Sequence, residues 1–150
     1  MKGWLLDANV VSELHRIRPD ARVLAWANGL PARLVTISIL TLAEIEQGLE
    51  ALRPSDPSRR EIARIFTLIE ATFVGRVRSV DDSVVRRWAR IRGQARRHFK
   101  KSPPPIDALL AATAIEHDLY LATRNTRDMK LTGARLFDPW RDDPALFPLK

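Results

Sequence analysis

Three carboxylates, Asp7, Glu44 and Asp107, occupy comparable places in the sequence. Asp7 ends a short apolar run, and Glu44 and Asp107 lie near the starts of predicted helices. Clustered carboxylates repel one another unless a cation compensates their charge. Oxygen ligands without thiolates suit Mg²⁺ or Mn²⁺, and such an ion can polarise a phosphoryl oxygen. The pattern predicts a divalent-metal site formed by Asp7, Glu44 and Asp107, which need not all touch the ion directly.

Each of the three acids also has a purely structural explanation. Asp7 could cap the helix that follows it. The segment from Thr41 to Glu44 matches a capping box, although Ser38 competes for the cap and would leave Glu44 inside the helix. Asp107, in the first turn of an apolar helix, could interact with the helix dipole. Their joint placement favours a shared site, because each acid follows or faces the end of a predicted strand.

Polar residues also follow the fourth predicted strand, at Thr123, Asn125 and Asp128. Thr123 and Asn125 could line the same strand-end site and orient water or a scissile phosphate. Asp128 could reach the site or lie on the surface. An ordinary polar loop is the alternative for all three residues.

The elements that must position these residues follow from apolar periodicity, caps and breakers. Strands are predicted at 3–6, 34–37, 76–80, 119–122 and 136–137, and helices at 10–16, 20–28, 38–52, 62–73, 82–101 and 106–117. The strands lack polar alternation, which indicates that both faces of the sheet are covered. Strands that alternate with helices predict an α/β three-layer sandwich with a parallel sheet. The 150 residues suit one domain, 1–150.

Two helices carry apolar stripes that predict their buried faces. The first stripe consists of Ile62, Ile65, Phe66, Ile69 and Phe73, and the second of Val84, Trp88, Ile91, Ala95 and Phe99. The second helix carries eight cations and no acid after its first turn: Arg86, Arg87, Arg90, Arg92, Arg96, Arg97, Lys100 and Lys101. A solvated helix face would explain these charges. The missing acids favour contact with phosphates.

The composition narrows the class of protein. The chain has 25 Lys and Arg against 18 Asp and Glu, a net charge of +7, which favours a polyanionic partner such as nucleic acid or simply keeps the protein soluble. With no cysteine, disulfides and thiolate sites are excluded. No apolar run suits a signal peptide or a membrane span, so we expect a cytoplasmic protein. Neither a phosphate-binding glycine loop nor a catalytic triad is present.

The ordered motifs resemble those of PIN-domain ribonuclease toxins of the VapC type, close to the FitB-like branch. The matching segments are 5–13, 38–48, 106–114 and 121–125, and the resemblance spans about 3–140. It implies a five-stranded parallel sheet, a Mg²⁺- or Mn²⁺-dependent endoribonuclease, an antitoxin partner and a homodimer. Folded RNA such as tRNA is the implied substrate.

The resemblance also implies roles for individual residues. Asp7, Glu44 and Asp107 match the three principal acids of the family. Many members have a fourth acid after the fourth strand, where this chain has Asn125, with Asp128 three residues later. The rival hypothesis is therefore a catalytically impaired PIN-fold module that binds RNA or has a regulatory role. A receiver-like phosphoacceptor is a third hypothesis, and it leaves the basic helix unexplained.

Overall fold

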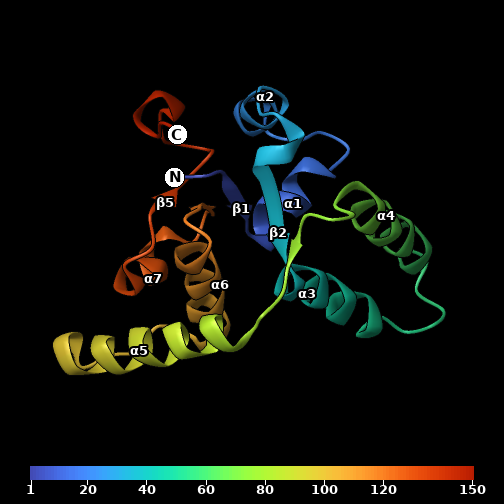
Figure 1. The fold of residues 1–150 in the computed structure, drawn as a ribbon. Coiled ribbons are helices and arrows are strands. Elements are labelled where there is room, and N and C mark those ends of the chain that lie inside the picture. The colour runs from blue at the N-terminus through green and yellow to red at the C-terminus, as the bar shows by residue number, and fades with distance from the viewer.

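Five parallel strands form one sheet in the order β3-β2-β1-β4-β5. The computed structural model describes residues 1–150 (Figure 1). The strands are β1 Trp4–Leu6, β2 Val35–Ser38, β3 Val77–Arg78, β4 Tyr120–Ala122 and β5 Leu136–Phe137. The central strand β1 is wholly buried, and its Leu5 lies between Thr36 of β2 and Leu121 of β4. The five-stranded parallel sheet expected from the sequence is confirmed.

Seven α-helices cover the two faces of this sheet (Figure 1). They are α1 Ala8–Leu14, α2 Ala21–Asn28, α3 Ile39–Glu50, α4 Arg59–Thr72, α5 Asp82–Phe99, α6 Pro105–Glu116 and α7 Thr126–Met129. Trp4 and Leu6 point to one face, where residues of α1 to α4 complete the core. Leu5 points to the other face and packs with α6 and α7. This alternation within one strand produces the three layers that the sequence predicts.

Helix α5 packs on α6 rather than directly on the sheet. Val84 and Ile91 of α5 form a small core with Ala108 and Ala112 of α6. In Figure 1, α5 runs along the end of the molecule where α3 and α6 begin. None of the helices is both long enough and apolar enough to cross a membrane.

Several predicted boundaries and faces were wrong. The first helix begins at Ala8, not near Val10, because Asp7 caps it. Phe99 was predicted to be buried and is 58% exposed, since the last turn of α5 extends past its neighbours. In α4, only Ile69 and Phe73 of the apolar stripe are fully buried. The remaining stripe residues are half-buried beside a groove.

Candidate active site at the strand ends

Asp7 is held at the carboxyl end of the central strand by a set of hydrogen bonds. Its carboxylate accepts from the Ala8 amide at 2.6 Å, the Asn9 amide side chain at 3.0 Å and the Thr123 hydroxyl at 2.6 Å. Only 8% of Asp7 is exposed. Burial raises the pKa of Asp7, and the three hydrogen bonds oppose that shift. Asp7 is thus a helix cap, as one explanation from the sequence proposed, and also a buried acid.

Thr123 and Asn9 join the end of β1 to the end of β4. The buried Thr123 hydroxyl oxygen also accepts from Asn9 Nδ2 at 3.3 Å and from the Asn125 amide at 3.0 Å. Asn9 Oδ1 accepts from the Arg124 amide at 3.2 Å. Asn9 is not among the site residues predicted from the sequence, and its place two residues after Asp7 was the available signal. Thr123 lies where the sequence predicted it, at the strand-end site.

Asp107 lies in the first turn of α6, and Asn125 contacts it directly. Asn125 Nδ2 donates to Asp107 Oδ2 at 2.9 Å. Burial raises the pKa of Asp107, as do the negative charges of Asp7 and Asp128, while the Asn125 hydrogen bond lowers it. The structure therefore brings Asp7, Asp107 and Asn125 to one place. Asp128 lies within electrostatic reach of Asp107 without a hydrogen bond to it.

Glu44 reaches the same place from the second turn of α3. Ser38 caps this helix through a 3.1 Å bond from the Leu40 amide, while Thr41 Oγ1 donates to Leu6 O. The capping-box explanation for Glu44 is therefore wrong, and its side chain is free to face the site. Partial desolvation raises the pKa of Glu44 first, and the charges of Asp7 and Asp107 raise it further.

The side chains at this site offer oxygen atoms, the donors that a hard divalent cation binds. Three of the four side chains at this place are carboxylates, and the fourth is the Asn125 amide. The charge of Asp7 raises the pKa of Glu44 and of Asp107, and the charge of Asp107 raises the pKa of Glu44. A bound cation would relieve that repulsion. As placed, no three His, Cys, Asp or Glu side chains lie close enough together to ligate one ion. These side chains would suit an ion that keeps several of its waters and needs few direct carboxylate ligands.

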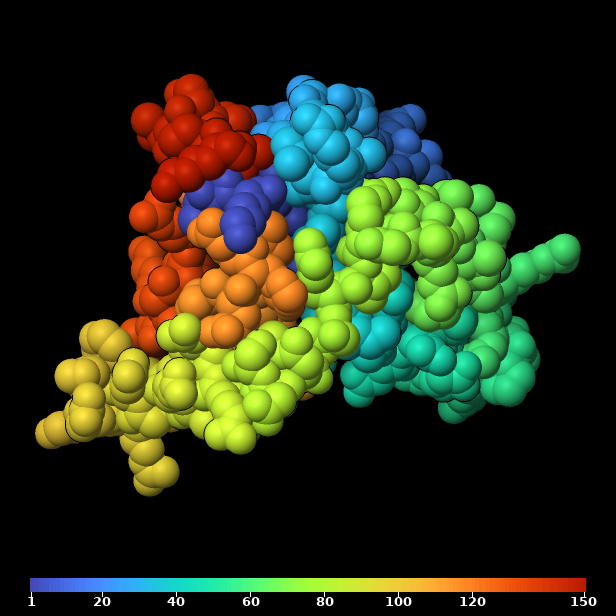
Figure 2. Space-filling view, viewed as in Figure 1, coloured from blue at the N-terminus to red at the C-terminus, as the bar shows by residue number.

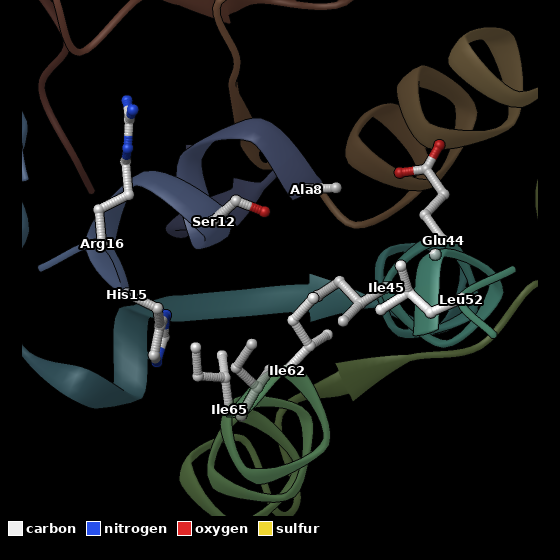
Figure 3. A pocket seen from close by; sticks show the side chains of 11 residues that line it. Ala8, Ser12, His15, Arg16, Glu44, Ile45, Leu52, Ile62 and Ile65 are labelled. Carbon is white, nitrogen blue, oxygen red and sulfur yellow. The ribbon is translucent and has the colours of Figure 1, made fainter. Parts of the chain in front are cut away.

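A groove of about 450 Å³ opens beside the acids, between α1, α3 and α4. Its floor is apolar and includes Ile45, Ile62 and Ile65, and Ser12 and His15 border it (Figure 3). Glu44 stands at its rim, with its carboxylate pointing away from Ile62 and Ile65 (Figure 3). The sequence identified the α4 stripe but did not reveal that the stripe lines an open groove next to the acids.

The cations of α5 are largely free of carboxylates. Arg86 pairs with Asp82 and Arg87 with Glu116. The other six cations, in α5 and the two residues after it, have no carboxylate within ion-pair distance: Arg90, Arg92, Arg96, Arg97, Lys100 and Lys101. Arg92 instead stacks on Trp88 and donates to Pro103 O, and Trp88 donates to Pro105 O. These contacts tie the basic helix to the segment that leads into Asp107.

Comparison with known proteins agrees with this geometry. The PIN domain family model matches residues 4–133. Toxin FitB of Neisseria gonorrhoeae is 36% identical over 138 residues, which cover 92% of this chain and 99% of FitB. VapC ribonuclease Y4jK of Sinorhizobium fredii is 34% identical over 143 residues, 94% of this chain and 99% of that protein.

A solved structure of FitAB bound to the IR36 DNA fragment shares the fold. It superposes with a TM-score of 0.83 at 34% identity, and covers 93% of this chain and 97% of that one. Residues 4–133, which the PIN family model matches, include Asp7, Glu44 and Asp107. The chain therefore belongs to the PIN-domain family, in the group that contains the FitB and VapC toxins.

Proposed function

We propose that residues 1–150 form one PIN domain that acts as a Mg²⁺-dependent endoribonuclease toxin, with Mn²⁺ able to substitute. The observation that carries this proposal is the convergence of Asp7, Glu44 and Asp107 at the strand ends, where the charge of Asp7 raises the pKa of both Glu44 and Asp107. The relative Y4jK is named a ribonuclease, and the relative FitB is named a toxin. The net charge of +7 suits a nucleic-acid substrate.

The residues of the acidic site would have different roles in the proposed reaction. Asp7 and Asp107 would hold the ion, and Glu44 would complete the acidic site directly or through water. When bound, the ion would polarise a phosphoryl oxygen and favour attack by water. Thr123 keeps Asp7 oriented, and Asn125 keeps Asp107 oriented. Asn125 adds no charge, so it would position water or a phosphate rather than neutralise the ion.

Cleavage of purified RNA tests this proposal. The wild type should cleave RNA with Mg²⁺ or Mn²⁺ and stop with EDTA. Asp7→Asn and Glu44→Gln should lower the cleavage rate by about 100-fold or more. Glu46→Gln changes an exposed acid of the same helix and should leave the rate unchanged. Full metal-dependent cleavage by Asp7→Asn would overturn the assignment. Transfer RNA should be included among the substrates, because folded RNA is the substrate class we propose.

The Asn125 position favours one second candidate, a catalytically impaired module that binds RNA. This candidate predicts that RNA binding persists while no product forms at any Mn²⁺ concentration. The endoribonuclease proposal predicts products whose yield depends on the metal. Gel analysis of the same binding reactions distinguishes the two.

We propose an antitoxin protein as the partner that keeps the nuclease inactive in the cytoplasm. A ribonuclease that acts on its own cell must be inhibited there, and the apolar groove offers a place for an apolar segment of an inhibitor. Glu44 stands at the groove rim, so an occupant would also screen the acids. Ile65→Glu should abolish co-purification with the cognate antitoxin while RNA cleavage persists. Retained co-purification would exclude this groove as the binding site.

We further propose that two copies associate through the end of the molecule where the acids lie. Three exposed apolar side chains, Ile39, Val85 and Ile106, lie near the starts of α3, α5 and α6 and are 43% to 45% exposed. A second copy would cover them. Sedimentation should show a dimer that Ile39→Asp converts to monomer, while a wild-type monomer would contradict the proposal.

A further inference from the structure

The last turn of α5 presents an aromatic ring to solvent. Phe99 is 58% exposed, and its only aromatic neighbour is His98, with ring centroids 6.4 Å apart at 62°. Lys100 then adopts the left-handed conformation and ends the helix. Figure 2 shows this end of α5 projecting from the body of the molecule. Packing of the fold does not require a large apolar ring at this position.

Unpaired cations surround the ring. Arg96, Arg97, Lys100 and Lys101 are exposed and have no carboxylate partner. Cations near a helix C-terminus interact favourably with its dipole, which explains part of the charge. The dipole does not explain an exposed ring among the cations. A ring within a basic surface is the combination that binds single-stranded nucleic acid, through base stacking and phosphate contacts.

A hollow of about 230 Å³ lies beside this ring. It separates α5 from the 3-10 turn Lys130–Thr132, and Gln94, His98 and Phe99 line one wall while Lys130 and Thr132 line the other. The hollow is large enough for one heterocyclic base. Polar groups on both walls could bind the edge of a base, as occurs in recognition of unpaired bases.

The hollow is connected to the acid site but lies apart from it. Trp88 donates to Pro105 O, next to the start of α6, and Phe99 lies 11 residues further along α5, about 16 Å at the rise of an α-helix. Lys130, on the other wall, follows Asp128 by two residues. An RNA strand could therefore run from the acids along α5 to the ring.

We propose that the last turn of α5 anchors an unpaired segment of the RNA substrate, outside the bond that is cleaved. A base stacks on Phe99 and enters the hollow, and the cations Arg96, Arg97 and Lys100 bind the adjoining phosphates. Duplex RNA offers phosphates but keeps its bases stacked within the helix, so the ring selects unpaired RNA. This inference rests on the proposed function, in which RNA is the substrate.

Binding measured in EDTA, which removes the metal that cleavage requires, tests the anchor without catalysis. The probe is a fluorescent single-stranded 2′-O-methyl RNA oligonucleotide, and its anisotropy is measured with the full chain in EDTA. Phe99→Leu keeps an apolar side chain but removes the ring, and should weaken binding about fivefold or more. Phe99→Tyr keeps the ring and should bind within about twofold of the wild type. Val74→Ala, at an exposed apolar position on α4's C-terminal side, serves as the matched control and should bind like the wild type.

Two further probes identify the interaction. Inorganic polyphosphate has charge but no bases, so its binding should not change in Phe99→Leu. A duplex of the same sequence should also be insensitive to Phe99→Leu. Equal weakening in the leucine and tyrosine variants would overturn the proposal. So would unchanged oligonucleotide binding with a changed sedimentation coefficient, because the ring would then belong to a protein interface.

The readout is independent of the proposed nuclease activity. If wild-type protein cleaves no RNA yet shows ring-dependent binding, the proposed nuclease function fails and the anchor remains. If cleavage is normal and binding does not depend on the Phe99 ring, the anchor proposal is wrong and the nuclease proposal stands.

Discussion

The Thr123 hydroxyl donates a 2.6 Å hydrogen bond to Asp7 Oδ2 across 116 positions of sequence. Both residues are buried, and they lie at the carboxyl ends of adjacent parallel strands. Together with the bonds from Ala8 and Asn9, this bond orients the acid and opposes the rise in its pKa caused by burial.

Thr123→Val should damage both stability and cleavage. The substitution preserves side-chain shape but leaves a buried carboxylate oxygen without this donor, which costs about 1–3 kcal/mol. We expect RNA cleavage to fall by about 10-fold or more, as for other residues that orient metal ligands. Urea unfolding and cleavage rates measure the two effects. Thr123→Ser retains the hydroxyl and should behave nearly as the wild type; a valine variant with wild-type values would show that the bond is dispensable.

Asn125→Asp should make the protein depend more on metal. The change replaces the donor to Asp107 Oδ2 by another acid beside it, which increases repulsion. We expect a lower melting temperature in EDTA and a larger rise with Mn²⁺ than in the wild type. Asn125→Ala removes the donor without adding charge, so it should not show the larger rise. An unchanged response to Mn²⁺ in Asn125→Asp would place this residue outside the ion's reach.

Asp107→Asn should leave the metal-free protein at least as stable as the wild type. The pKa of Asp107 is raised, so its ionisation costs more free energy in the folded protein than in the unfolded chain. The neutral amide removes that repulsion, but it also weakens the binding of a cation. Thermal melts should therefore show little or no loss in EDTA and a smaller Mn²⁺-induced rise. Strong destabilisation without metal would assign Asp107 a structural role instead.

We expect the free energy of unfolding to depend on pH through His117. Burial lowers the pKa of His117 below its ordinary value, and the nearby positive charge of Arg78 lowers it further. The negative charges of Asp81 and Glu116 oppose this shift. The unfolded chain then takes up a proton more readily than the folded protein. This contribution to stability is complete above the unfolded pKa of about 6.5 and is lost as pH falls through the folded value.

The measurement compares wild type with His117→Gln between about pH 8 and about pH 5. Free energies of unfolding should decline more steeply in the wild type as the pH falls through this range. Parallel curves would show that His117 does not contribute.

Gly3→Ala should destabilise the strand that leads to Asp7. Gly3 has φ +156°, and an added Cβ would lie 2.4 Å from the carbonyl oxygen of Leu34. The neighbouring atom is backbone and cannot move away freely, so we expect a loss of about 1–3 kcal/mol. Gly93→Ala is the control, because it lies within α5 with open space around it and should stabilise by about 1 kcal/mol. Equal stability of the two variants in chemical unfolding would contradict this reasoning.

Local sequence signals predicted most of the fold but fewer of the contacts within the site. Ser38 and Asp81 cap the helices that the sequence assigned near them, because capping depends on residues close in sequence. The bond between Asn125 and Asp107 joins two chain segments whose relative position only the packed sheet determines. Phe99 shows a second limit of sequence analysis. Its spacing predicts an apolar helix face, but it does not show at which residue the rest of the chain stops covering that face.

The α4 stripe shows the same limit on a larger scale. Ile62 and Ile65 have the spacing of a buried face, and the chain itself covers only part of them. An apolar pattern does not reveal whether the cover comes from the same chain or from another molecule.

The pairing of β1 with β4 also determines when the site can exist. Asp7 directly follows the first strand to leave the ribosome, whereas its partner Thr123 and the Asp107 partner Asn125 emerge much later. A growing chain that ends before these residues has no oriented pair of acids. Synthesis of the chain thus precedes the assembly of its site, which gives an inhibitor made at the same time the opportunity to bind before cleavage begins.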